Sequence, residues 1–213
     1  NIKKNIFFLN NVSCLPNLKK IIVSGSCLEY GSHNGLCREN KTYKSNSFFS
    51  FSKNTIREFL QMICEEKKID YVWFRFFYVY GLNQRKNSII STIIDNLVNK
   101  KNIKIKNPAA KNDYVYIDDV IDAIVKSINI NKINSIINIG TGKTTSNYDL
   151  IRKLENLLSK GNELSKKIQK NIKNKKLLSK KSHNLNSKKI INWLPQYNVD
   201  QGLKKILKLK GFM

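Results

Sequence analysis

Short apolar runs alternate along the chain with longer segments of helical periodicity, and this alternation restricts the possible folds more than any other feature. Three runs have the length and the β-branched and aromatic content of buried strands: 21–24, 71–77 and 135–139. The segments between them repeat apolar residues at helical spacing, as at 52–68, 88–99 and 118–128. Because strands joined through helices pair in parallel, the sequence predicts an α/β fold around a parallel sheet.

The remaining segments predict shorter elements around that sheet. A short extended piece is expected at 114–116, and Ser146 with Asp149 three residues later has the spacing of a capping box that opens a helix. The segment 159–181 is rich in Lys, Asn and Ser, so we expect a solvated connection there. A last helix is expected at about 199–209.

A strong excess of basic residues raises the question of an acidic partner. Lys and Arg number 39 against 15 Asp and Glu, which gives a formal net charge of +24 over 213 residues. Almost all of this charge is lysine, whereas base edges and phosphates are contacted preferentially by the planar fork of arginine. We therefore expect surface lysines and no nucleic-acid partner. A basic nucleic-acid-binding module is the weakest alternative, and it predicts binding with a steep salt dependence.

Motifs for metals, disulfides and membranes are not found in the sequence. The four cysteines form no Cys-x-x-Cys pair, and with only His33 and His183 we expect no metal site and a reducing, cytoplasmic location. The longest apolar runs stop short of the ~20 residues of a membrane-spanning helix, and the amino end does not resemble a secretory signal. We expect no membrane partner.

The glycine-containing segment 140–144 does not have the spacing of a phosphate-binding loop. A Walker motif needs a glycine where Ile137 stands, and a dinucleotide-binding motif needs one where Thr145 stands. A tight turn between a strand and a helix is the expected role.

Six segments are informative as an ordered set. They are VSGSCLEYG at 23–31, FSFSK at 49–53, FRFFYVYG at 74–81, NDYVYIDDV at 112–120, INIGTG at 137–142 and NWLP at 192–195. Their order and spacing resemble the NAD(P)-dependent epimerase/dehydratase family, the extended short-chain dehydrogenase/reductases that modify nucleotide sugars. The resemblance covers nearly the whole chain. It implies a partial Rossmann-like, doubly wound parallel sheet with a small mixed C-terminal subdomain for the substrate.

The resemblance assigns catalytic positions to Ser26, Lys53 and Phe49. In the family, a serine or threonine at the position of Ser26 donates a hydrogen bond to the substrate oxygen. A tyrosine can transfer a proton when a lysine one helical turn later stabilises its phenolate, and Lys53 stands at that lysine position. Phe49 stands at the tyrosine position and has no proton to transfer. Losing a positioned acid or base typically costs ~10²- to 10⁴-fold in rate.

The resemblance also implies the residues that bind NAD or NADP and the nucleotide sugar. The implied cofactor-binding residues are Ser24, Lys53, Phe76 and Tyr78, and the implied substrate-binding residues are Ser26, Asn87, Asn112 and Tyr116. Asn112 stands where the family usually has an arginine for the diphosphate, and an amide cannot supply that charged fork. The family's Gly-x-x-Gly-x-x-Gly unit does not occur in the sequence, so roughly 80 to 100 residues are expected ahead of Asn1.

The resemblance further predicts domains, partners and function. Residues 1–80 and 114–145 are assigned to the cofactor-binding domain, and 81–113 and 146–213 to the substrate subdomain. A homodimer through helices 52–68 and 88–100 is implied. The implied function is nucleotide-sugar epimerisation or dehydration for surface polysaccharide or lipopolysaccharide synthesis, in a fragment or truncated form. The alternative is a catalytically inactive member that acts as a binding or scaffold protein.

Overall fold

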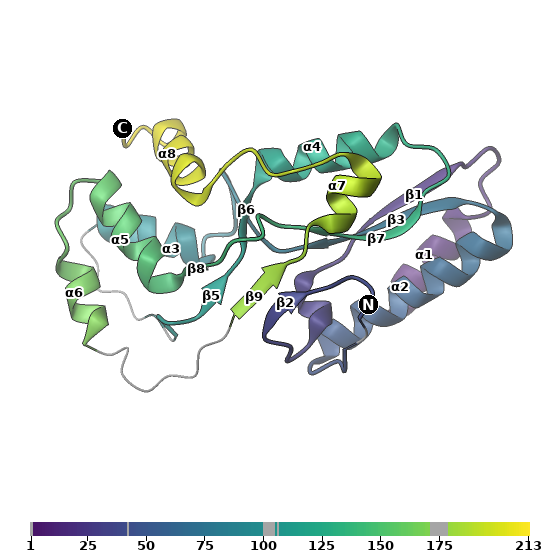
Figure 1. Ribbon diagram of the computed structural model, residues 1–213, viewed down its shortest axis with the longest axis horizontal. Coiled ribbons are helices and arrows are strands. Elements are labelled where there is room, and N and C mark those ends of the chain that lie inside the picture. Colours follow the sequence, from purple (N-terminus) through teal and green to yellow (C-terminus); the bar gives the residue numbers. More distant parts are fainter. Residues whose placement is uncertain (1, 42, 100–104, 106, 171–178) are drawn as a thin grey trace.

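A three-stranded parallel sheet with the order β1-β3-β7 forms the centre of the fold (Figure 1). The computed structural model describes residues 2–41, 43–99, 105, 107–170 and 179–213. The three strands are β1 (Lys20–Ser24), β3 (Asp70–Phe76) and β7 (Asn134–Ile139). Successive side chains of a strand point to opposite faces, so Trp73 enters the apolar cluster on one face and Phe74 the cluster on the other. A parallel sheet is expected to be buried on both faces in this way.

Helices cover both faces of the sheet (Figure 1). Those on the Trp73 face are α1 (Ile2–Val12) and α2 (Phe48–Lys67), and those on the Phe74 face are α4 (Ile117–Ile128) and α7 (Leu185–Ile191). On α2, the residues that enter the cluster are spaced by three or four positions, and Leu60 among them is fully buried. The apolar stripe of an amphipathic helix therefore supplies this cover.

A second lobe is mainly helical (Figure 1). Its helices are α3 (Ile89–Val98), α5 (Asn147–Leu157), α6 (Glu163–Gln169) and α8 (Val199–Leu209). Their apolar faces meet in one cluster that includes Ile93, Leu154 and Leu203. The hydroxyl of Tyr80 donates to the carbonyl oxygen of Val199 at 3.3 Å, which ties the start of α8 to this cluster.

Short strands lie between the two lobes. β4 (Tyr78–Tyr80) pairs in parallel with β6 (Tyr114–Tyr116). A second sheet has the order β2-β9-β5-β8, with β2 (Gly35–Cys37), β9 (Ser179–Ser182), β5 (Lys111–Asn112) and β8 (Thr145–Ser146). Only its β5–β8 pair is antiparallel among the described residues. The 3-10 helix η1 (Cys27–Tyr30) follows β1.

The structure confirms the α/β class and the predicted strands and helices, with two differences. α2 begins at Phe48, four residues before the expected start, because Ser47 caps it by accepting the backbone N–H of Ser50. The segment 159–181 is not only a solvated connection, since it contains α6 and the start of β9. Glu155 accepts the backbone N–H groups of Leu164 and Ser165 in the first turn of α6, and residues 171–178 of that segment lie outside the described residues.

The structure bears on the predicted domain boundaries and dimer helices without testing either. α7 belongs to the predicted substrate subdomain, yet Ile191 and Trp193 pack in the cluster on the sheet. The indole N–H of Trp193 donates to the carbonyl oxygen of Asp119 at 2.9 Å. α2 packs on α1 and α3 packs on α5, so the two predicted dimer helices lie in different lobes, and Lys100 lies outside the described residues. The boundaries and the dimer stay predictions.

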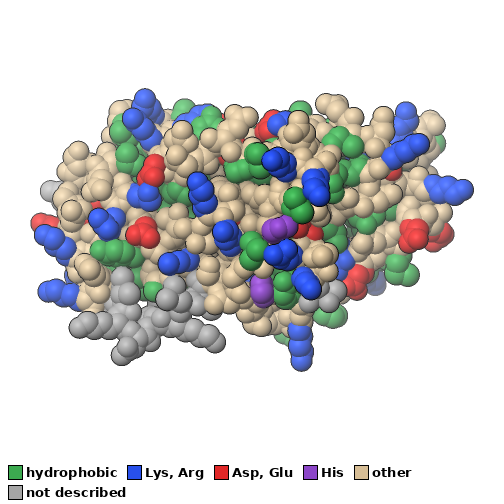
Figure 2. All heavy atoms as spheres, viewed as in Figure 1, with side chains coloured by type: hydrophobic (Ala, Val, Ile, Leu, Met, Phe, Trp, Pro, Cys, Tyr) green, Lys and Arg blue, Asp and Glu red, His purple; other side chains and the backbone are tan. Residues whose placement is uncertain are grey.

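Basic side chains are spread over the surface rather than gathered in a single patch on the face that Figure 2 shows. Acidic and apolar side chains lie between them. None of the described helices combines the length and the apolar content that crossing a membrane would need.

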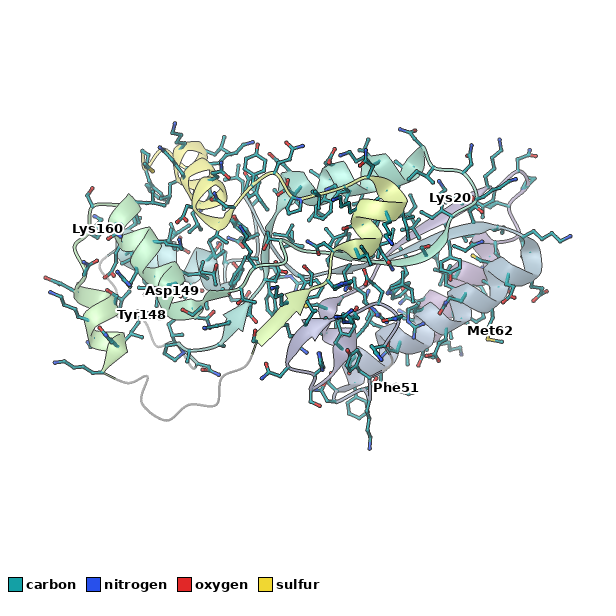
Figure 3. The ribbon with its side chains drawn as sticks, in the orientation of Figure 1. Lys20, Phe51, Met62, Tyr148, Asp149 and Lys160 are labelled. Carbon is teal, nitrogen blue, oxygen red and sulfur yellow. The ribbon has the colours of Figure 1, made fainter. Side chains whose placement is uncertain are left out.

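Lys20, at the start of β1, holds the last turn of α4 (Figure 3). Its Nζ donates to the carbonyl oxygens of Ser127 at 2.8 Å and Ile128 at 2.9 Å, and also to that of Ile130. The last carbonyls of a helix have no partner within the helix, and a cation is favoured at this end of the helix dipole. We expect Lys20→Met to lower the free energy of unfolding by about 1–2 kcal/mol in urea denaturation.

The matched control for this prediction is Lys19→Met, which removes the neighbouring exposed ammonium. A change below about 0.5 kcal/mol is expected for the control. Equal losses in the two variants would show that the bonds of Lys20 to α4 contribute nothing specific.

Candidate functional site

The carboxyl end of β1 leads directly into the candidate site. Ser26 is the N-cap of η1, and its Oγ accepts the backbone N–H of Leu28 at 3.2 Å. Glu29 completes the capping box because its Oε1 accepts the backbone N–H of Ser26 at 2.7 Å. This loop therefore has a fixed shape, and it holds Ser24 and Ser26 at the edge of the sheet where open α/β sheets bind ligands.

Lys53 reaches this edge from α2. Its Nζ donates to the carbonyl oxygen of Ser24 at 2.7 Å and lies 5.9 Å from the centroid of the Trp73 ring. Burial lowers the pKa of Lys53, and the negative charge of Glu29 partly offsets that effect. The ammonium is a donor beside the strand end, suited to hydroxyl oxygens of a bound sugar or ribose.

Phe49 lies one helical turn before Lys53, at the second residue of α2, and its side chain is about half exposed (49%). It offers no hydroxyl to the site. Tyr30, in the loop after β1, is fully buried and donates its hydroxyl to Oδ1 of Asn138 at 2.7 Å. Burial raises the pKa of Tyr30, so it does not replace the missing acid or base.

A buried ion pair between Glu29 and Arg75 holds this loop to β3. Oε2 of Glu29 accepts the Nε–H of Arg75 at 2.9 Å, and both oxygens accept the indole N–H of Trp73 at 3.0 Å. The Nε of Arg57 lies 3.9 Å from the same carboxylate, and the guanidinium of Arg75 stacks on the Tyr30 ring at 4.6 Å. The side chain of Glu29 is fully buried, so these donors compensate for its lost hydration.

The other predicted binding residues lie outside β1 and α2. Phe76 stacks on Phe74 on the α4 face of β3, and Tyr78 is half-buried with its ring 5.7 Å from that of Tyr114. Asn87 is exposed before α3. The side chain of Asn112 donates to the hydroxyl of Tyr114 at 3.4 Å.

Tyr116 lies inside the cluster of the second lobe, where only 2% of it is exposed. Its ring contacts those of Tyr80 and Tyr197. The structure thus brings Ser24, Ser26 and Lys53 to one edge and leaves Tyr116 in a core. The binding roles of these residues stay predictions.

Sequence reasoning assigned no role to three buried charged residues: Glu29, Arg75 and Asp113. Asp113 is fully buried and accepts the backbone N–H groups of Thr141 at 2.6 Å and Gly142 at 2.9 Å. It therefore fixes the tight turn after β7. For Glu29 and Arg75 the available signal was a lone charge between apolar residues, because such a charge is buried only with a partner. Asp113 follows Lys111 and Asn112 and gave no such signal.

We expect Glu29→Gln to lower the free energy of unfolding by about 3–5 kcal/mol, because it leaves the buried guanidinium of Arg75 without its counter-ion. Urea denaturation followed by circular dichroism measures this loss. Glu58→Gln is the matched control, since Glu58 also pairs with an arginine but is 65% exposed. A loss for Glu29→Gln no larger than for the control would contradict the assigned role.

The exposure of the four cysteines predicts which thiols react in the native protein. Cys14 is exposed, whereas Cys27, Cys37 and Cys64 are buried. Burial raises the pKa of Cys27 to about 12 and those of Cys37 and Cys64 to about 11. Because the thiolate is the reactive form, the native protein is expected to react with a disulfide reagent at about pH 8 through Cys14 alone. The other thiols should react only after denaturation.

Mass spectrometry of the labelled protein identifies the modified thiol, and Cys14→Ser is expected to remove the fast reaction. Fast labelling of Cys27, which directly follows Ser26, would instead indicate a nucleophile at the site.

The chain resembles known proteins in sequence and in structure. Residues 9–140 match the profile of the NAD dependent epimerase/dehydratase family. CDP-abequose synthase of Salmonella muenchen is 24% identical over 205 residues, which cover 92% of this chain and 65% of that protein. A dTDP-4-dehydro-6-deoxyglucose reductase of Escherichia coli is 26% identical over 164 residues, covering 75% of this chain and 52% of that protein. The chain spans less than two thirds of the length of these two relatives.

Solved structures share the fold. MoeE5 in complex with UDP-glucuronic acid and NAD superposes with a TM-score of 0.86 at 16% identity, over 99% of this chain and 71% of that one. UDP-glucuronic acid 4-epimerase from Bacillus cereus, with UDP-glucuronic acid and NAD, gives 0.84 at 21% identity, over 100% of this chain and 68% of that one. These likenesses confirm the Rossmann-type fold. Because the family profile matches more than half of the sequence, the chain belongs to the NAD dependent epimerase/dehydratase family.

Proposed function

We propose that this chain forms the lysine-bearing and sugar-binding part of an NAD(P)-dependent enzyme that acts on a nucleotide sugar. The observation that carries the proposal is the hydrogen bond from Nζ of Lys53 to the carbonyl oxygen of Ser24 at the carboxyl end of β1, two residues before Ser26. An ammonium and a hydroxyl at the end of a parallel strand can bind a ribose and a sugar oxygen side by side.

The residues present fit one end of a nicotinamide dinucleotide. Lys53 is partly desolvated and bonded only to a carbonyl oxygen among the described residues, so its other N–H groups are available to ribose hydroxyls. Lys53 with Ser24 would hold that end. The bound nicotinamide supplies reversible hydride transfer. The printed sequence contains no Gly-x-x-Gly-x-x-Gly, so the pyrophosphate end has no matching loop within these residues.

The names of the relatives support a nucleotide sugar as the substrate. CDP-abequose synthase and the dTDP-4-dehydro-6-deoxyglucose reductase are named for CDP- and dTDP-linked sugars, and the two solved structures hold UDP-glucuronic acid. We place the function of the whole protein in the synthesis of surface polysaccharide or lipopolysaccharide sugars on this ground.

Phe49 favours a second candidate function, that of a binding protein without turnover. A Tyr-to-Phe variant of the Bacillus cereus epimerase was solved with a 4-deoxy-4-fluoro analogue of UDP-glucuronic acid and NAD, with a TM-score of 0.83 to this chain. In that protein, loss of one tyrosine hydroxyl is compatible with binding of both ligands. This chain has Lys53 and Ser26 and carries Phe49 at the tyrosine position. We therefore expect it, too, to bind both ligands.

Saturation-transfer NMR with NAD and with UDP-glucose tests binding to the chain. We expect signals from the nicotinamide ribose and from the sugar, and Lys53→Ala is expected to weaken NAD binding about tenfold because it removes a charged donor. Lys19→Ala removes an exposed lysine and is the control. Equal NAD binding in both variants would contradict the role of Lys53.

Phe49→Tyr separates the two candidate functions. If this residue alone limits turnover, the variant should convert a nucleotide sugar in the presence of NAD ~10²- to 10⁴-fold faster than the native chain, measured as loss of the substrate by chromatography. Phe51→Tyr adds a hydroxyl two residues further along the same helix and should have no effect. Ligand binding without turnover in Phe49→Tyr would show that the missing hydroxyl is not the only defect.

A further inference from the structure

β9 carries a half-buried lysine, Lys180, that is not part of the site at the end of β1. The strand lies between β2 and β5 in the second sheet (Figure 1). Nζ of Lys180 donates to the carbonyl oxygens of Gly31 at 2.8 Å and His33 at 3.0 Å. An ammonium has three N–H groups, and within the part of the chain that the structure describes no acceptor takes up the third.

The positive charge of Lys180 has no counter-ion among the described residues. Lys126, Lys153 and Lys205 each pair with an aspartate, whereas Lys180 takes part in none of the ion pairs between described residues. A partly desolvated charge without an opposite charge is unfavourable. The binding of an anion to this ammonium would therefore be favoured.

The register of the second sheet places Lys180 beside Asn112. The two residues are direct partners on the parallel strands β9 and β5, so their side chains lie on the same face of the sheet. On the other side, the partner of Lys180 is Gly35 of β2, where an added Cβ would meet no heavy atom within 4 Å. β2 therefore leaves open space next to the position of Lys180.

The charge of Lys180 also acts on the loop that carries Ser26. Burial raises the pKa of Cys27 and of Cys37, and the positive charge of Lys180 is the strongest effect in the opposite direction on both thiols. Cys27 directly follows Ser26. Lys180 is thus a neighbour of the loop with the predicted sugar-binding serine and also of Asn112, at the predicted diphosphate position.

We propose that Lys180 binds the diphosphate of the nucleotide sugar, and that its ammonium supplies the positive charge that Asn112 cannot. A lysine contacts phosphate oxygens as a point charge on a flexible stem, so it does not need the position of the family's arginine. This proposal rests on the proposed function and deepens it, because it names a residue that determines affinity for the nucleotide part of the substrate.

Titration of the native chain with UDP and with uridine, followed by NMR at a fixed ionic strength, is the first test. The two ligands share the nucleoside, so a difference in affinity comes from the diphosphate. We expect UDP to bind at least about tenfold more tightly than uridine. Equal affinities would overturn the proposal without the need for a variant.

Lys180→Met keeps an apolar stem and removes the charge. It is expected to raise the Kd for UDP about tenfold and to leave the Kd for uridine unchanged. Lys181→Met is the matched control, because it removes the charge of the next residue, which is exposed and points to the opposite face of β9. An equal loss in the two variants would overturn the proposal, since it would show non-specific attraction to a chain of net charge +24.

A double variant separates binding of UDP from the structural bonds of Lys180. Asn112→Arg returns a positive charge to the neighbouring strand without restoring the bonds to Gly31 and His33. We expect Lys180→Met combined with Asn112→Arg to bind UDP within about threefold of the native chain. If the double variant shows a native unfolding transition and still binds UDP as weakly as Lys180→Met, the proposal is wrong.

NAD binding distinguishes failure of this proposal from failure of the proposed function. Lys180→Met is expected to bind NAD as the native chain does. A native chain that binds NAD and UDP, with no specific effect of Lys180→Met on UDP, would overturn this proposal alone. A native chain that binds no NAD would instead contradict the proposed function.

Discussion

The ion pair between Glu29 and Arg75 is the interaction on which the remaining site depends. It joins the loop after β1 to the carboxyl end of β3, and the same carboxylate accepts the backbone N–H of Ser26. A buried pair of this kind adds little net stability over an apolar pair, but losing one partner is costly, because the other charge is left without hydration. The position of Ser26 and the shape of the strand end are therefore set by electrostatics in the interior. The edge of the sheet at the end of β1 depends on this support.

Asp113 has the corresponding role where the two lobes meet. Its carboxylate accepts the N–H groups of the turn at Thr141 and Gly142 and the hydroxyl of Ser182, while its carbonyl oxygen accepts the N–H of Tyr78. One fully buried residue thus connects β4, β9 and the end of β7. Since every acceptor position of the carboxylate is used, Asp113 has a structural task and is not available as a catalytic acid or base. The glycine-containing segment after β7 is thereby a turn held by a side chain, as its spacing in the sequence indicated.

The main strands could be predicted from the sequence because β1, β3 and β7 are short apolar runs between amphipathic segments. β9 could not, since its residues Ser-Lys-Lys-Ser favour no strand by themselves and pair with β2 and β5 only through tertiary contacts. α6 was missed for a similar reason, as its first turn is capped by Glu155 from another helix. In the site, the resemblance identified Ser26 and Lys53, which lie at the expected edge. The sequence alone does not show which acidic residue pairs with which arginine, so the ion pair between Glu29 and Arg75 could be identified only from the structure.

Phe49 has a further consequence in evolutionary terms. Its ring is half exposed and the start of α2 is secured by Ser47 and Ser50, so the helix does not rely on the ring for its core. Phenylalanine and tyrosine codons differ by one base, and exchanging the two side chains at an exposed position disturbs little packing. Lys53, to which the resemblance assigns the stabilisation of a phenolate, lies one helical turn after Phe49 on α2. A single base change therefore converts residue 49 to tyrosine, the usual residue of the family, or back to phenylalanine. Neither exchange is expected to lower the stability of the fold by much.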